Sequence, residues 1–220
     1  METSIIVVIC LFLILAFGIT AYYFYYYRPN QTNAKRYEIE LLGSEITFNE
    51  DYNSSLKVSN LVSGRPEFLI SNLGYGISLA WEMYIPNLAG NDKWNNKFNI
   101  VKPIFAMNDS PQIGYNPKRN YLSIILKYRD NPFRAQYSEI RVDDLKMQTW
   151  NKYILVINGR TVNLFINGKL AISKIIPSLP VIYGIESNIE LGQINNNFQG
   201  RIQNMKLYPF PLSYKEIEMV

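Results

Sequence analysis

The sequence contains no histidine and only one cysteine. Without histidine, Ser-His-Asp and Cys-His catalytic arrangements and His-ligated zinc are excluded. The cysteine, Cys10, lies inside an apolar segment, so no intramolecular disulfide can form. The rest of the chain must therefore be stabilised by its core alone, and the absence of disulfides is typical of a reducing compartment.

The sequence also lacks a concentrated charge of either sign. Its 22 Lys and Arg residues and 18 Asp and Glu residues give a net charge of +4, spread along the chain without a block of five or six basic residues. Nucleic-acid binding needs a concentrated basic face. We therefore expect no nucleic-acid partner.

The N-terminal segment contains a long uncharged apolar run, which the rest of the chain does not. Residues 5–21 carry no charge, and six aromatic residues follow before Arg28. A helix from Ile5 to Tyr27 would be about 35 Å long, enough to cross a lipid bilayer with its tyrosines in the interfacial aromatic belt. The pattern predicts a transmembrane helix over 1–27, with the lipid bilayer as its partner. A polar linker is predicted over 28–36. The residues assigned to the anchor and its interface are Ile5, Leu11, Leu15, Tyr22, Tyr25, Tyr27 and Arg28.

A cleaved signal peptide is the alternative interpretation, but residues 1–4 contain no Lys or Arg and the apolar run is long. Arg28, Lys35 and Arg36 all follow the helix, and the positive-inside rule then places the rest of the chain on the cytoplasmic side of a single-pass membrane protein. Three Asn-X-Ser/Thr sequons, at Asn30, Asn53 and Asn108, would suit the opposite side. Chance supplies such sequons in an Asn-rich chain, so they do not decide the orientation.

From Tyr37 onward, short apolar runs alternate with turn residues, which predicts an all-β domain over 37–220. In 77–85 the odd positions are all apolar, the period of a strand with one buried face. The expected strands are 37–42, 67–71, 77–85, 100–107, 121–128, 138–142, 153–157, 162–166, 170–175, 189–191 and 200–208.

Two short turns give the strongest local signal. Asn158-Gly159 and Asn167-Gly168 each separate β-prone runs, and both dipeptides are typical of type I′ turns. They predict a three-stranded meander. Ser213 and Glu216 have the spacing of a capping box, which predicts a final helical turn.

Several motifs of the C-terminal half resemble a known family. Trp150, the meander, 189–192, 198–202 and 212–217 come in the order of a laminin-G-like domain of the concanavalin A-like lectin/glucanase superfamily, and 77–86 is similar to its early Trp-containing strand. The resemblance implies a two-sheet jelly-roll sandwich. Independently of it, Trp81 and Trp150 each lie in a strand or at its entry, which predicts that both are in or near the core. Gly200, just after Phe198, predicts a close backbone approach or a bulge. The residues that mark this fold are Trp81, Trp150, Asn158, Gly159, Asn167, Gly168, Phe198 and Gly200.

The carboxylates do not predict catalysis. Glycan hydrolases of this superfamily carry E-x-D-x-x-E on one strand, but Glu38 and Glu40 are followed by Gly43 at the third position. The chain is therefore expected not to be an enzyme. The superfamily also has a rim calcium site, for which 108–109 and 195–197 are the candidate loops, but they lack clustered carboxylates. Ordinary polar turns are the better interpretation, and no cofactor is predicted.

Two functional hypotheses follow. The first is a non-catalytic, membrane-anchored structural protein whose sandwich binds another protein. The Asn, Ile, Lys and Tyr bias is typical of membrane proteins of large DNA viruses, so a virion component that joins the virion membrane to a capsid or coat protein is one form of it. The second is a lectin-like glycan receptor, with Trp94, Tyr115 and Tyr183 as aromatic platforms on rim loops.

Overall fold

The structure is a computed structural model that describes residues 15, 16, 18, 38–48, 52–61, 76–87, 101–131, 134–182, 187–193 and 198–220. Backbone contacts divide the chain into two units, Met1–Tyr37 and Glu38–Val220. Apart from three residues, the predicted membrane helix and all of the linker lie outside the described part. Within the described part, no helix combines the length and the hydropathy that a membrane crossing requires.

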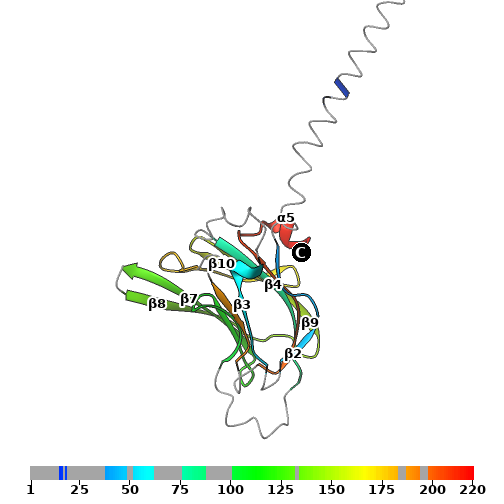
Figure 1. The fold of residues 1–220 in the computed structure, drawn as a ribbon, viewed down its shortest axis with the longest axis vertical. Helices are drawn as coiled ribbons and strands as arrows, with labels where there is room; N and C mark the ends of the chain where they lie inside the picture. The colour runs from blue at the N-terminus through cyan, green and yellow to red at the C-terminus, as the bar shows by residue number, and fades with distance from the viewer. Residues whose placement is uncertain are drawn as a thin grey trace, which may run out of the picture. The chain divides into compact units, whose positions relative to one another are not determined.

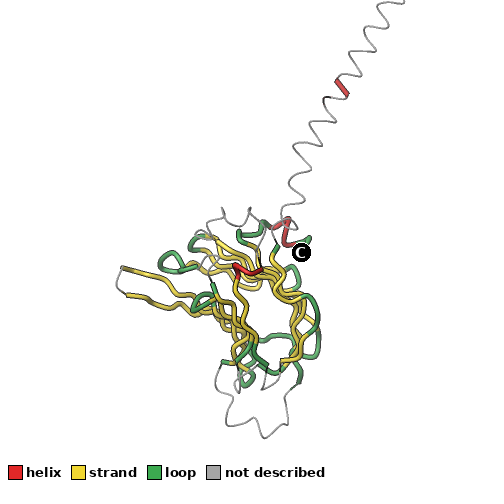
Figure 2. The backbone as a smooth tube through the Cα atoms, viewed as in Figure 1, coloured by secondary structure: helices red, strands yellow, loops and turns green. Residues whose placement is uncertain are grey.

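The unit Glu38–Val220 is a β-sandwich of two antiparallel sheets (Figures 1 and 2). The first sheet has the order β1-β13-β4-β9-β10-β11, with β2 also paired to β13, and the second has the order β3-β12-β5-β6-β7-β8. The first sheet consists of β1 (Ile39–Leu42), β2 (Ile46–Phe48), β4 (Gly76–Tyr84), β9 (Trp150–Asn158), β10 (Thr161–Ile166), β11 (Lys169–Ile175) and β13 (Gly200–Tyr208). The second consists of β3 (Ser54–Lys57), β5 (Lys102–Met107), β6 (Gln112–Asn116), β7 (Tyr121–Asn131), β8 (Arg134–Val142) and β12 (Asn188–Leu191). Two short helices, α3 (Val58–Leu61) and α5 (Tyr214–Ile217), complete the described elements.

Alternation of side chains determines which residues of β4 enter the core. Trp81 and its neighbours at odd positions face inward, and in the β4–β9 register Trp81 lies opposite Tyr153. Their rings are stacked, with centroids 5.3 Å apart and planes 12° apart. Trp81 is therefore a core residue, as the sequence predicts.

Phe198 connects the aromatic parts of the two sheets. Its ring centroid lies 6.2 Å from that of Phe48 on β2 and 5.5 Å from that of Tyr115 on β6. All three side chains are fully buried. Offset and edge-to-face aromatic contacts of this kind stabilise a core beyond the area that they bury.

The two predicted turns of the meander differ in type. At Asn167 and Gly168 both φ angles are positive, 51° and 76°, which confirms a type I′ turn. The first turn is not type I′. The β9–β10 register pairs Asn158 with Thr161, so the central residues are Gly159 and Arg160, and only Gly159 has a positive φ. That is the pattern of type II′, which also accepts glycine at its first central position.

Among the described strands, three were not predicted from the sequence, namely β2, β3 and β6. Each is short or polar, and β3 (SSLK) and β6 (QIGYN) show little of the apolar alternation that marks a strand. The predicted strand at 67–71 lies outside the described residues. β7 and β8 are longer than predicted and extend as a hairpin arm beyond the neighbouring strands (Figure 1).

The chain ends near α5, which begins at the predicted capping box. The backbone N–H and the hydroxyl of Ser213 both donate hydrogen bonds to the Glu216 carboxylate, at 2.8 and 2.7 Å. The Tyr214 ring then meets Phe165 edge-on at 5.2 Å, and Ile217 is buried. The helix therefore covers apolar residues on the outer face of the first sheet.

Candidate binding surfaces

An aromatic and cationic stack lies on the outer face of the first sheet. Arg201, Tyr84 and Trp150 are register partners across β13, β4 and β9, and all three are half-buried. The Arg201 guanidinium lies 4.3 Å from the Tyr84 ring centroid and 5.4 Å from that of Trp150. The two rings are 5.8 Å apart and inclined by 52°. We refer to these three residues as the Arg201 stack.

The stack is held in place from one side by an ion pair. Arg201 Nη1 lies 3.0 Å from Glu45 Oε1, and both side chains are partly exposed to solvent. An exposed pair contributes little to stability on its own. Together with two cation–π contacts it nevertheless limits the rotamers of a long side chain, so the stack presents an ordered surface.

A polar row separates the stack from α5. Gln203, Glu82 and Lys152 lie side by side on β13, β4 and β9, and the Gln203 amide donates a 2.6 Å hydrogen bond to Glu82. Lys206 forms a 3.1 Å ion pair with Glu38. Partial burial lowers the pKa of Lys152, while the nearby Glu82 opposes that shift.

The outer face of the second sheet carries a polar groove of about 320 Å³. Its central residues form one register row across four strands: Ser55 on β3, Glu190 on β12, Ala106 on β5 and Gln112 on β6. The rest of its lining includes Asn53, Pro103, Asn108, Gly192 and Gln193. We refer to this feature as the second-sheet groove.

The turn beside the groove is fixed by paired hydrogen bonds. The Asn108 N–H donates to the Asn188 carbonyl at 2.8 Å, and the Asn188 N–H donates to Asn108 Oδ1 at 3.0 Å. Next to it, the Asp109 carboxylate is ion-paired with the Lys127 ammonium. These contacts tie the β5–β6 connection to β12, so this end of the groove is built on fixed backbone.

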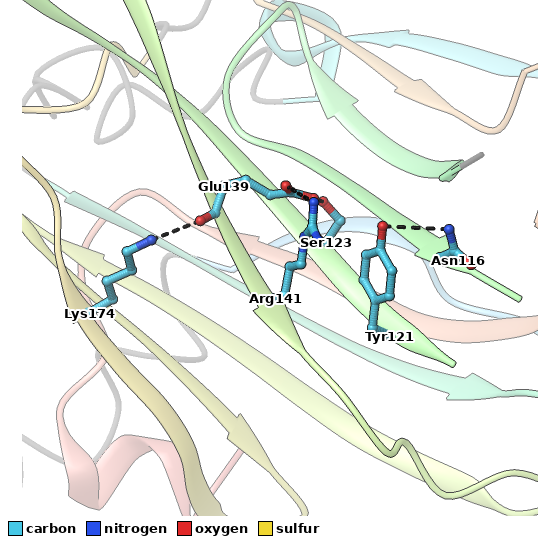
Figure 3. Close-up of polar contacts among 6 residues, drawn as sticks. All are labelled: Asn116, Tyr121, Ser123, Glu139, Arg141 and Lys174. Carbon is cyan, nitrogen blue, oxygen red and sulfur yellow. Dashed lines mark hydrogen bonds and ion pairs between the residues drawn. The ribbon is translucent and has the colours of Figure 1, made fainter. Parts of the chain in front are cut away.

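A charged network continues the same face onto β7 and β8 (Figure 3). Glu139 accepts hydrogen bonds from the Ser123 hydroxyl at 2.7 Å and from Arg141 at 2.6 Å, and its backbone carbonyl accepts one from the Lys174 ammonium at 2.8 Å. The Arg141 hydrogen bond is the main cause that lowers the pKa of Glu139. Arg141 also lies over the Tyr121 ring, 5.1 Å from its centroid.

Two aromatic residues lie in positions that differ from those predicted from the sequence. Trp150 is not in the core, because its register partner Tyr84 faces outward from β4. Tyr115 is not on a rim loop, because it is an inward residue of β6 with only 1% exposure. Its hydroxyl donates to Asn120 Oδ1 at 3.0 Å, and burial raises the pKa of Tyr115 to about 12. Trp94 and Tyr183 lie outside the described residues.

Of the two candidate calcium loops, the structure describes the first and not the second. Asn108 and Asp109 are engaged with Asn188 and Lys127, as described above. Residues 195–197 lie outside the described part. Among the described residues, no three Cys, Asp or Glu side chains lie close enough together to hold a metal ion.

Tyr84 and Arg201 were missed by the sequence reasoning, although part of the signal was present. The odd positions of 77–85 face the core, so Tyr84, at an even position, must face outward. Its meeting with Trp150 and Arg201 depends on the β13-β4-β9 register between segments far apart in the chain, which no local pattern encodes.

Comparisons with known proteins show similarity at the level of fold. No family model and no curated protein sequence matches the chain. Among solved structures, the chain resembles the receptor-binding domain of botulinum neurotoxin C/D mosaic serotype (16% identity, TM-score 0.55, 83% of this chain and 45% of that one). It also resembles the botulinum neurotoxin type G receptor-binding domain (17% identity, TM-score 0.53, 83% and 43%). A third is the binding domain of paraclostridial mosquitocidal protein 1 (16% identity, TM-score 0.53, 82% and 45%).

These similarities define the class of fold, an all-β sandwich of the kind found in toxin receptor-binding domains. This chain spans less than half the length of those structures. The names of those structures describe binding domains.

Proposed function

We propose that this chain is a non-catalytic interaction protein whose sandwich binds another protein through the Arg201 stack. The composition of the stack carries the proposal, because Trp, Tyr and Arg are the residues that most often dominate protein–protein binding energy. Tyr84, Trp150 and Arg201 are also ordered by contacts with one another, which lowers the entropy lost when a partner binds.

The resemblance to toxin binding domains supports a recognition role. One of these structures is the binding domain of botulinum neurotoxin DC in complex with rat synaptotagmin II, so a sandwich-containing chain of this class is found with a protein partner. In our proposal the sandwich belongs to the laminin-G-like branch of the concanavalin A-like superfamily. The motif order from Trp150 to Ile217 supports that assignment.

The proposal includes the membrane. Residues 1–27 anchor the chain, and the basic residues after them place the sandwich on the cytoplasmic side. The partner is then a capsid or coat protein that the chain links to a virion membrane, as the composition indicates. Protease protection on microsomes tests the orientation. A sandwich that is protected and glycosylated at Asn53 or Asn108 overturns it.

Site-directed photo-crosslinking tests the binding surface. Thr47 is exposed and is the register partner of Arg201 on β2, so a photo-reactive residue there lies beside the stack. We expect it to capture a defined protein in the source cells, and we expect Trp150→Ala to abolish the capture. The same residue at Ser173, exposed on β11, is the control position. Identical products from both positions, or products insensitive to Trp150→Ala, contradict the proposal.

A further inference from the structure

Two short segments of the chain are almost identical in sequence. Residues 157–160 read Ile-Asn-Gly-Arg, and residues 166–169 read Ile-Asn-Gly-Lys. Asparagine is one of the thermolabile residues. In an Asn-Gly dipeptide the backbone nitrogen of glycine can attack the carboxamide carbon of asparagine, because glycine has no side chain to hinder the approach. From the sequence alone, Asn158 and Asn167 should therefore undergo this reaction at similar rates.

The structure makes the two asparagines different. Asn167 Oδ1 accepts a 2.9 Å hydrogen bond from the backbone N–H of Lys152, and Asn167 Nδ2 donates a 3.0 Å hydrogen bond to Asn151 Oδ1. Asn151 is itself buried, and its Nδ2 donates to the carbonyl oxygens of Lys146 and Thr149. Both polar atoms of the Asn167 carboxamide are therefore held by fixed partners.

The carboxamide of Asn158 has no such restraint. Within the described part of the chain it makes no hydrogen bond, and neither does the backbone N–H of Gly159. Asn158 and Asn167 are both exposed, so access of water does not distinguish them. Beyond its chain neighbours, a Cβ atom built at Gly159 would have only Leu179 Cδ2 within 4 Å, so this turn is open. The Asn158 side chain is therefore free to rotate toward the Gly159 nitrogen.

We propose that Asn158 is a site of spontaneous deamidation in the folded chain and that Asn167 is protected from it. The Gly159 backbone nitrogen gives up its proton and forms a bond to Asn158 Cγ, while the side-chain nitrogen takes up a proton and leaves as ammonia. The product is a cyclic succinimide. Water then breaks either C–N bond of the imide ring, which gives aspartate or isoaspartate. The reaction consumes water, releases ammonia and replaces a neutral carboxamide by a carboxyl group that ionises at neutral pH.

Isoaspartate at position 158 would change the backbone at a paired position of the first sheet. Asn158 is the register partner of Thr161 on β10 and of Gly76 on β4. In isoaspartate the main chain runs through the side-chain carbons, so it is longer than a normal peptide at this point. Gly159 and Arg160 can then no longer close a two-residue turn in the same register. Aged protein should therefore melt at a lower temperature than fresh protein.

This reaction is independent of the proposed protein contact. Asn158 and Trp150 lie at opposite ends of the nine-residue strand β9, about 26 Å apart. Tyr84 and Arg201 lie at the Trp150 end of the sheet. The photo-crosslinking result therefore has no bearing on deamidation, and each proposal can fail without the other.

The test is peptide mapping of the full chain in detergent after incubation at mildly alkaline pH. Trypsin cleaves after Lys152, Arg160 and Lys169, so the adjacent peptides 153–160 and 161–169 carry the two Asn-Gly dipeptides separately. Mass spectrometry measures the conversion of each peptide, and digestion at slightly acidic pH limits conversion during preparation. A sample denatured in guanidinium chloride gives the rates that the sequence alone determines.

We expect Asn158 to convert about five- to hundredfold faster than Asn167 in the folded chain, as expected when two hydrogen bonds must first open at Asn167. In the denatured chain the two rates should be similar. Asn151→Ala removes the acceptor of Asn167 Nδ2 and should raise the Asn167 rate. Thermal melts check that this variant is folded, and the denatured sample decides the question if it is not.

Three results would overturn the proposal. These are equal rates for Asn158 and Asn167 in the folded chain, the same ratio of rates in the folded and denatured chains, and no conversion of folded Asn158 in the time in which the denatured chain converts. Asn158→Gln tests the structural consequence, because glutamine forms the corresponding ring far more slowly. Ageing should lower the melting temperature of the wild type and not that of Asn158→Gln. An equal fall in both would contradict a role for isoaspartate at position 158.

Discussion

Gly200, at the start of β13, lies where two other parts of the chain leave no room for a side chain. A Cβ atom there would be 2.2 Å from Phe198 Cζ and 2.6 Å from the Tyr84 carbonyl oxygen. We expect Gly200→Ala to lower the free energy of unfolding by about 1–3 kcal/mol, the usual effect of overpacking. Urea denaturation measures it. Adding Phe198→Leu should not restore stability, because the Tyr84 carbonyl belongs to the backbone. If Gly200→Ala has the same urea midpoint as the wild type, the close packing of Phe198 and the Tyr84 carbonyl against Gly200 is contradicted.

Gly168 is constrained by its backbone conformation and not by crowding. No atom lies within 4 Å of a Cβ built there, but its φ is +76°, where β-branched residues are strained. Gly168→Val should therefore destabilise the chain by about 1–3 kcal/mol. Lys169→Val, at the adjacent exposed strand position, is the control and should change stability by less than about 0.5 kcal/mol. Equal melting curves for Gly168→Val and wild type would refute the type I′ turn.

At the scale of elements, Glu139 links neighbouring strands through a charge that depends on pH. The Arg141 hydrogen bond is the main cause that lowers the pKa of Glu139 from its ordinary value of 4.5. The folded state therefore favours the carboxylate, and this contribution is present above the unfolded-state pKa. It is lost as the pH falls through the lower folded-state pKa.

Acid denaturation of variants tests this contribution. Glu139→Gln should reduce the loss of stability between neutral pH and about pH 3, and Arg141→Ala should act in the same direction because it removes the main cause of the shift. Urea midpoints across this range are the measurement. If both variants lose stability with acidification as steeply as wild type, the network of Figure 3 does not stabilise the fold through Glu139.

Elements were predictable from the sequence where a local signal was strong. The alternation of 77–85, the Asn167-Gly168 turn and the Ser213–Glu216 capping box each depend on neighbouring residues, and the structure contains all three. The turn at Gly159 is not of the predicted type, because an Asn-Gly dipeptide does not by itself determine which two residues are the central ones of the turn. The pairing of β9 with β10 determines that these are Gly159 and Arg160. β3 and β6 could not be predicted because their pairing partners, and not their own apolar pattern, make them strands.

At the scale of the molecule, both candidate surfaces are products of register between distant segments. Tyr84, Trp150 and Arg201 meet only because β4 lies between β9 and β13. Ser55, Glu190 and Gln112 line one groove only because β12 is inserted between β3 and β5. Composition and motifs predict a sandwich, but several strand orders satisfy the same motifs. The functional surfaces therefore could not be derived before the sheet order was known.

The division of the chain into Met1–Tyr37 and Glu38–Val220 leads to a final prediction about independent folding and membrane attachment. The core residues of the second unit come from both of its sheets, and it contains no cysteine, so residues 38–220 need neither the N-terminal segment nor a disulfide to fold. We expect this fragment alone to give a β-type circular dichroism spectrum and one cooperative melting transition.

Liposome flotation of the fragment and the full chain then tests the proposed anchor. A span of about 20 apolar residues partitions strongly into a bilayer, so the full chain should float with the vesicles. The fragment should remain at the bottom of the gradient, because few large apolar side chains are exposed among its described residues. The full chain is washed with high salt to remove electrostatic attachment by Arg28, Lys35 and Arg36. Flotation of the folded fragment would assign membrane binding to the sandwich itself, and failure of the full chain to float would remove the anchor from the proposed function.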